Sequence, residues 1–244
     1  IEPVEVKYLY LSDIDLGFCH GCLACIDKGE ELCPKRKLTA AIEAELTAAD
    51  GVILAAPVYA HQVTALMKNF MDHFAYFFHR PRFFDKTALV LSTTGGSGLK
   101  ETLGYLKFTA TGWGFNVIGS LGVISSFFNK EADINKTAGC GKAAKYRTQK
   151  LREIDAIATQ MIKGMKTGER KAPGSYELML FRGMRYKARY NPCDSKYWEA
   201  KGWFSERYYV KGPVNPVTLA VVNFLDWVMG VIYSKMAKGS GLKG

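Results

Sequence analysis

The pattern of apolar and polar positions divides the first two-thirds of the chain into strands that alternate with helices. Residues 4–11 alternate like a half-buried strand, whereas 51–57 (GVILAAP) and 86–93 (KTALVLST) are continuous apolar runs of strand length. Another strand is expected over 114–124. Apolar residues at helical spacing predict helices over 38–49, 62–78, 99–111 and 142–166. This alternation predicts an α/β fold, a doubly wound parallel sheet with helices on both faces.

The last third of the chain has a different character. Residues 172–212 mix aromatic and basic side chains with loop formers, and 217–233 is strongly apolar with Asn223, Asp226 and Gly230 on one helix face. We therefore expect a core domain over 1–168 and an extension over 169–244 that ends in an apolar helix. Seventeen residues with an acidic group inside are too short and too polar for a membrane span. A packed or subunit-interface helix is the first interpretation; a helix lying in a membrane interface, or an anchor, is the alternative.

Composition and charge narrow the class of protein. The 244 residues are 48% hydrophobic, enough for one sizeable core with an appendage. The net charge is +10, and residues 135–212 hold 18 Lys and Arg against 7 Asp and Glu. A surface with this excess of positive charge favours a phosphorylated cofactor, an acidic electron-transfer partner or an anionic membrane as the binding partner. The alternative is that the charges are simply solvated. No nucleic-acid motif accompanies the charge, so we expect no nucleic-acid partner.

Four of the six cysteines fall within fifteen residues, in the run Cys19-x2-Cys22-x2-Cys25-x7-Cys33-Pro34. Three thiols two residues apart, closed by a fourth that precedes a proline, favour a [4Fe–4S] cluster. Unliganded thiols, a zinc site and disulfides remain alternatives, although zinc usually takes two separate Cys-x-x-Cys pairs. The span 15–28 has little apolar content, so we expect the metal to order it.

Clustered cysteines also bear on the compartment. Residues 1–11 lack the basic start of a signal peptide, and Cys140 and Cys193 alone stand outside the run. The sequence therefore predicts a reducing, cytoplasmic location, with membrane association as an addition if the apolar helix binds lipid.

Two loops are expected to meet at the carboxyl ends of adjacent strands, where doubly wound sheets bind their ligands. Residues 57–61 (PVYAH) follow one strand and 93–98 (TTGGSG) follow the next. Glycines let backbone amides approach a planar ring or an anion, and the second loop opens a helix. A tight connection without a ligand is the alternative for a Gly-rich turn.

These loops, with Lys68-x-Phe70-x-Asp72 on the following helix, resemble the flavodoxin-like NAD(P)H-dependent FMN reductase family. The cysteine run makes the chain similar to the iron–sulfur flavoprotein branch of that family. The resemblance covers residues 4 to about 165. It implies bound FMN, contacted by Pro57, Val58, Tyr59, Thr93, Thr94, Gly95 and Gly96.

The resemblance implies an FMN-dependent oxidoreductase that passes electrons between a reduced donor, NAD(P)H or ferredoxin, and an acceptor. The cluster on Cys19, Cys22, Cys25 and Cys33 would carry single electrons. No catalytic side chain is assigned. A homodimer or homotetramer is expected, with a ferredoxin-type electron partner and peripheral membrane contact through 217–233 as further options. One alternative is a cluster-free FMN, quinone or nitro reductase. Another is a non-catalytic flavin-binding electron carrier or membrane-associated module.

Two features depart from the family pattern. Its first strand and its Ser/Thr-rich phosphate loop should precede Ile1, so we expect part of the native amino terminus to be missing here and assign no FMN phosphate ligands. That strand is central in the order 2-1-3-4-5. The second departure is His73, which stands where the family often has Arg. Because it lies among Phe70, Phe74 and Phe77, we expect a packed or interface histidine rather than a catalytic one.

Overall fold

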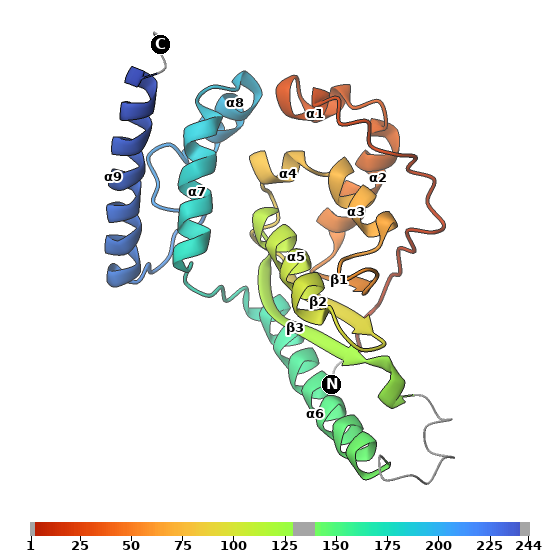
Figure 1. Ribbon diagram of the computed structural model, residues 1–244. Coiled ribbons are helices and arrows are strands. Elements are labelled where there is room, and N and C mark those ends of the chain that lie inside the picture. The colour runs from red at the N-terminus through yellow and green to blue at the C-terminus, as the bar shows by residue number, and fades with distance from the viewer. Residues whose placement is uncertain (1–2, 129–139, 240–244) are drawn as a thin grey trace. The chain divides into compact units, whose positions relative to one another are not determined.

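The computed structural model describes residues 3–128 and 140–239, and the chain divides into two compact units, Ile1–Arg170 and Lys171–Gly244. The described part of the first unit contains a three-stranded parallel sheet in the order β1 (Gly51–Pro57), β2 (Thr87–Thr94), β3 (Asn116–Ile124) (Figure 1). Strands β1 and β2 pair in register, from Gly51 opposite Thr87 to Pro57 opposite Thr93. Both strand ends that precede the predicted ligand loops therefore lie side by side.

Helices cover both faces of this sheet, as the apolar spacing predicts. One face packs against α2 (Arg36–Ala48), α3 (Ala65–His73) and α5 (Leu99–Gly112). The other face meets α6 (Cys140–Thr167), and the close approach is made possible by glycine: a Cβ on Gly119 would lie 2.7 Å from Ile157. The predicted α/β fold with helices on both faces is confirmed.

An aromatic core fills the space beside the sheet. Phe74, Phe77 and Trp113 are fully buried, and their ring centroids lie 5.2 to 5.8 Å apart. The predicted helix over 62–78 is divided into α3 and α4 (Tyr76–His79). This break turns the chain so that two arginines, Arg80 and Arg82, face the segment that carries the cysteines.

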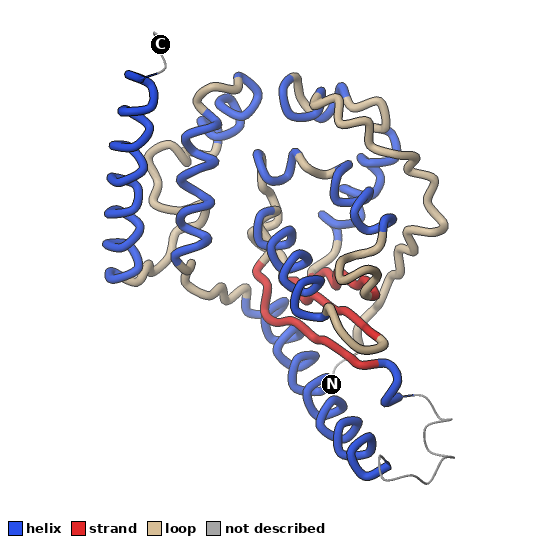
Figure 2. The backbone as a smooth tube through the Cα atoms, in the orientation of Figure 1, coloured by secondary structure: helices blue, strands red, loops and turns tan. Residues whose placement is uncertain are grey.

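The strand predicted at 4–11 does not form. Residues 3–10 have no regular structure (Figure 2), and Val4, Val6, Tyr8 and Tyr10 are all exposed. A strand exists through hydrogen bonds to a neighbour, and in the order 2-1-3-4-5 this segment would pair with a central strand rather than with β1. The described residues provide no such partner, so the alternating pattern is left unpaired.

The run 15–33 forms a loop with two short helical pieces, α1 (Ala24–Asp27) and η1 (Glu30–Leu32). After β3 a further turn, η2 (Ser125–Phe128), ends the described part before residue 129.

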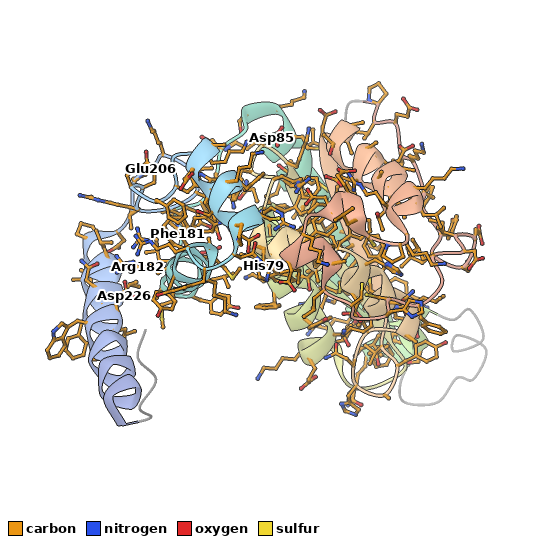
Figure 3. The ribbon with its side chains drawn as sticks, turned by 90° about the horizontal axis from the view of Figure 1, so that it is seen from above. His79, Asp85, Phe181, Arg182, Glu206 and Asp226 are labelled. Carbon is orange, nitrogen blue, oxygen red and sulfur yellow. The ribbon has the colours of Figure 1, made fainter. Side chains whose placement is uncertain are left out.

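The second unit contains α7 (Ser175–Ala188), α8 (Pro192–Ala200) and α9 (Pro216–Gly239). The aromatic residues of 172–212, which the sequence analysis placed among loop formers, form its core: Phe181 and Trp198 are fully buried and stack at 5.4 Å. The polar face of α9 packs on α7, where Arg182 bonds the carboxylate of Asp226 and the side chain of Asn223 (Figure 3). Gly230 lies beyond the residues whose side chains are described. Within the described ranges, no helix combines the length and the apolar composition that a membrane span requires.

Candidate functional site

The two predicted ligand loops lie together at the carboxyl ends of β1 and β2. The amide of Val58 donates to the carbonyl of Thr93 at 2.8 Å, and His61 Nε2 lies 3.3 Å from Ser97 Oγ. Tyr59 presents two-thirds of its surface to solvent. The structure thus brings the predicted residues of both loops to one edge of the sheet.

The first loop is a strained turn. Tyr59 and Gln62 exchange two backbone hydrogen bonds of 2.9 Å, and the intervening Ala60 and His61 have φ values of 46° and 61°. This is the left-handed region, which costs a non-glycine residue about 1–2 kcal/mol. Among the described residues, the remaining non-glycine residue with positive φ is Leu23, in the cysteine loop. Backbone strain therefore gathers at the two candidate sites, as it often does at functional sites.

The second loop is organised by its own side chains. Thr94 Oγ1 donates to the carbonyl of Ser97 at 2.6 Å and accepts from the amide of Gly96 at 3.1 Å. A Cβ on Gly95 or Gly96 would meet nothing within 4 Å, so open space adjoins both glycines. A Cβ on Gly98 would lie 2.6 Å from Val58 Cγ1 and 3.0 Å from the Cα of His61. Gly98 is therefore the glycine that lets the loops touch, a role that the sequence analysis missed.

The four clustered cysteines line one pocket of about 30 Å³ together with Phe18, His20, Leu23, Pro34, Lys35 and His73. Their thiols form no disulfides. Burial, followed by the neighbouring Cys33, Cys19 and Cys22, raises the pKa of Cys25 to about 11, because each neighbour disfavours a second negative charge. Within the described residues, no three His, Cys, Asp or Glu side chains are close enough to bind a single metal ion.

Residues of α3 hold the start of the cysteine loop. Asn69 Nδ2 donates to the carbonyl of Gly17 at 2.7 Å, and its Oδ1 accepts from the amide of Cys19 at 3.0 Å. His73 Nε2 lies 3.1 Å from the same carbonyl and must be the donor, since a carbonyl accepts. The expected packed histidine is found: His73 is buried, and its Nδ1 has no hydrogen-bond partner.

The residues of the motif Lys68-x-Phe70-x-Asp72 form an ion pair, a core contact and a contact with the cysteine loop. Lys68 pairs with Asp72 one turn on, and Phe70 packs in the core. The backbone carbonyl of Asp72 accepts from Cys19 Sγ at 3.7 Å. Helix α3 starts three residues after Gln62, the end of the strained turn, and ends at the cysteine pocket. Its nine residues span about 13 Å, so one short helix joins the two candidate sites.

Sequence reasoning missed the side chains that hold the cysteine loop in place, Asn69, Glu30 and Arg80. One signal could have found Arg80: it lies in the apolar segment FFHRPRFF, and a cation in such a segment needs a partner when it is buried.

Comparison with known proteins agrees with these observations. The sequence model of the NADPH-dependent FMN reductase family matches residues 2–130, a little more than half of the chain. The chain therefore belongs to this family and is a flavin-dependent oxidoreductase.

Its relatives bear the name of the branch that the cysteine run indicated. The chain is 29% identical over 189 residues to an iron–sulfur flavoprotein of Archaeoglobus fulgidus, covering 73% of this chain and 84% of the relative. It is 28% identical over 127 residues to an iron–sulfur flavoprotein of Clostridioides difficile, covering 52% of this chain and 56% of that one. It spans about a third of an iron–sulfur flavoprotein of Methanocaldococcus jannaschii, at 37% identity over 71 residues.

Among solved structures, the apo form of an NADH:FMN oxidoreductase aligns with 58% of this chain and 70% of its own. The sequence identity is 24% and the TM-score is 0.33.

Proposed function

We propose that this protein is an FMN-dependent oxidoreductase in which a [4Fe–4S] cluster on Cys19, Cys22, Cys25 and Cys33 exchanges single electrons with the flavin. The observation that carries the proposal is that all four cysteines line one pocket at the end of α3, the helix that begins beside the two predicted flavin loops. The names of the relatives point the same way.

The chemistry of the donor set fits a cluster. Four thiolates are the usual ligands of a [4Fe–4S] centre, which holds them farther apart than a single ion would. This accounts for four cysteines around one pocket although the described residues contain no three-ligand group for one ion.

The two loops fit a flavin ring. Tyr59 offers an exposed aromatic face, and the space beside Gly95 and Gly96 allows a planar group to approach the backbone. Pro57, Val58, Thr93 and Thr94 would complete the contact because they surround the same sheet edge. The phosphate ligands remain unassigned.

FMN, when bound, accepts electrons in pairs and releases them in pairs or singly, and the cluster carries single electrons. The protein supplies position. The strained turn at Ala60 and His61 and the bonds of Thr94 hold the loops in one shape. The contact of His61 with Ser97 keeps them together. Asn69 joins the helix between the sites to the cysteine loop. The amide of Gly96 serves the loop itself, since it already donates to Thr94.

Partners follow as part of the same proposal. NAD(P)H or a ferredoxin-type protein would supply electrons, and an acidic electron-transfer partner suits the basic surface. A cytoplasmic, reducing location suits thiols that bind a cluster. We further propose a homodimer or homotetramer. The second candidate function is a cluster-free NAD(P)H-dependent reductase, which is favoured by the lack of a three-ligand group among the residues that the structure describes.

Cofactor content tests this proposal. Protein prepared without oxygen should contain one FMN with roughly four iron and four sulfide per chain, and should show flavin bands on a broad iron–sulfur absorbance. FMN with no iron would favour the cluster-free reductase. A pure cofactor-loaded protein that binds FMN but is reduced by neither NAD(P)H nor ferredoxin would favour an electron carrier.

A further inference from the structure

The cysteine loop is held by the protein at two points, and both holding residues come from one stretch of chain. At the first, Asn69 bonds the carbonyl of Gly17 and the amide of Cys19. Leu16 beside them is buried in the main core. This end of the loop is thus fixed to α3 by the two hydrogen bonds of Asn69 and one core side chain, together with the contacts of His73 with the carbonyl of Gly17 and of Cys19 Sγ with the carbonyl of Asp72.

The second point is Arg80, whose side chain is 3% exposed. Its Nη1 donates to the carbonyl of Ile26 at 3.2 Å, Nη2 donates to the carbonyl of Cys25, and Nε donates to Glu30 Oε2 at 3.2 Å. The last carbonyls of a helix lack partners inside it, so one guanidinium satisfies two of them in α1. Its planar fork of donors suits this task, and lysine cannot reproduce it.

Further charges tie Glu30 to the rest of the unit. Arg82 bonds Glu30 at 2.8 Å and also reaches Glu43 of α2, which accepts from Tyr76 at 2.9 Å. The guanidinium of Arg82 lies 5.0 Å from the ring centroid of Phe77, a fully buried core residue. The network of Arg80, Arg82, Glu30 and Glu43 therefore contacts the aromatic core, and its buried charges are paired.

We propose that Asn69 and Arg80 are positioning residues that keep the cysteine loop ordered, with its four cysteines around one pocket, before any metal enters. The ordering of the loop then belongs to the metal-free chain, in place of the metal-driven ordering expected from the sequence. A loop already ordered loses less conformational freedom when it takes up a cluster, so it should hold the cluster more tightly. Only this consequence rests on the proposed function.

Hydrogen exchange of the full-length chain, freed of iron by chelation and kept reduced, tests the inference. Peptides covering residues 15–33 should be protected in the wild type. Arg80→Lys and Asn69→Ala should each speed their exchange by about tenfold or more, since each removes hydrogen bonds that hold the loop. Peptides from β1, β2 and β3 should not change, which shows that the variants fold.

Matched controls exist in the same unit. Arg170 donates to the carbonyls of Phe84, Gly114 and Phe115 at 3.2, 2.8 and 3.3 Å, and Asn116 donates to the carbonyl of Glu169 at 2.8 Å. Arg170→Lys and Asn116→Ala remove bonds of the same kind away from the cysteines. Both should leave exchange at 15–33 unchanged.

The outcomes separate this inference from the proposed function. A loop that exchanges at the rate of an unstructured peptide in the metal-free wild type, or that stays equally protected in Arg80→Lys, overturns the inference even if a cluster assembles. A protected, Arg80-dependent loop that never takes up iron supports the inference and overturns the cluster. After reconstitution, Arg80→Lys should lose iron to a chelator several-fold faster than Arg170→Lys, a readout that does not depend on turnover.

Discussion

At the scale of single residues, a substitution at Gly95 can test FMN binding without disturbing the fold. A side chain there would enter open space, so Gly95→Val should fold normally while its branched group occupies the place of the flavin. We expect FMN affinity to fall at least about tenfold, measured by fluorescence titration. Gly104→Val on α5, where a Cβ also meets nothing within 4 Å, is the control. Equal FMN affinity in the two variants would remove Gly95 from the site.

The cysteines give a second prediction at this scale. Replacing Cys19, Cys22, Cys25 or Cys33 with Ser should remove most of the iron, because a [4Fe–4S] cluster needs four ligands, while FMN content should stay within about 20% of wild type. Cys193→Ser, in the second unit, should keep its iron. Iron and flavin are counted together on anaerobically prepared protein. Full iron in all four variants would refute these ligands.

Glu30 links the cysteine loop to acid stability. Burial raises the pKa of Glu30, but the hydrogen bond and charge of Arg82, with the charge of Arg80, outweigh it, so the pKa lies below its ordinary value of 4.5. A lowered folded-state pKa contributes stability above pH 4.5 and loses it as the pH falls further. Glu30→Gln should therefore lower the free energy of unfolding at pH 7 by roughly 3 kcal/mol. In this variant the free energy of unfolding should also decrease less steeply than in the wild type as the pH falls below 4.5.

Denaturant titrations from pH 3.5 to 7 measure this effect. Glu153→Gln is the control, since Glu153 pairs with Lys150 at a partly exposed position on α6 and should change stability by less than about 1 kcal/mol. If Glu30→Gln keeps the wild-type slope with pH, the network does not hold Glu30 in its charged form.

At the scale of elements, the sequence predicted what periodicity and local spacing encode. The apolar runs at 51–57 and 86–93 became β1 and β2, and the loops after them met because parallel strands end at one edge. Periodicity failed at 4–11, where alternation describes a strand but cannot supply its neighbour. Periodicity also failed at 172–212. There α7 and α8 form around an aromatic core whose residues do not recur at a regular spacing.

For the candidate sites too, the sequence predicted one part and missed another. The cysteine run and the Gly-rich loop are contiguous in sequence and could be predicted. The sequence signals that Arg80 needs a partner, but the contacts themselves could not be predicted, because Asn69 reaches Cys19 across 50 positions and Arg80 reaches Cys25 across 55. Contacts of that separation depend on how α3 and α4 are oriented, and a single sequence does not encode that locally.

At the scale of the whole molecule, α9 exposes an apolar face over 217–227, and no described side chain of its own unit covers it. Val217, Val221 and Phe224 recur at four- and three-residue spacing and are largely exposed, as is Trp227, whereas Val222 on the opposite side is fully buried. This spacing suits pairing with another helix. It is the surface on which the proposed homo-oligomer would depend.

We expect Val221→Glu with Phe224→Glu to halve the number of subunits, because charge in an apolar interface is costly. Light scattering at several protein concentrations measures the mass. Leu151→Glu, at an exposed apolar position on α6, should leave it unchanged. An unchanged mass in the double variant, with loss of binding to anionic vesicles, would assign the face to a lipid surface instead.

The central claim is that one chain passes electrons between a flavin and a cluster ligated by Cys19, Cys22, Cys25 and Cys33. Its most direct test is to reduce the protein stepwise without oxygen while recording flavin absorbance and the paramagnetic resonance of iron on the same sample. An iron signal of a reduced [4Fe–4S] centre should grow as the flavin is reduced, and it should be missing from Cys19→Ser, whose flavin is still reduced. Complete flavin reduction with no iron signal in the wild type would show that no such cluster receives electrons from the flavin.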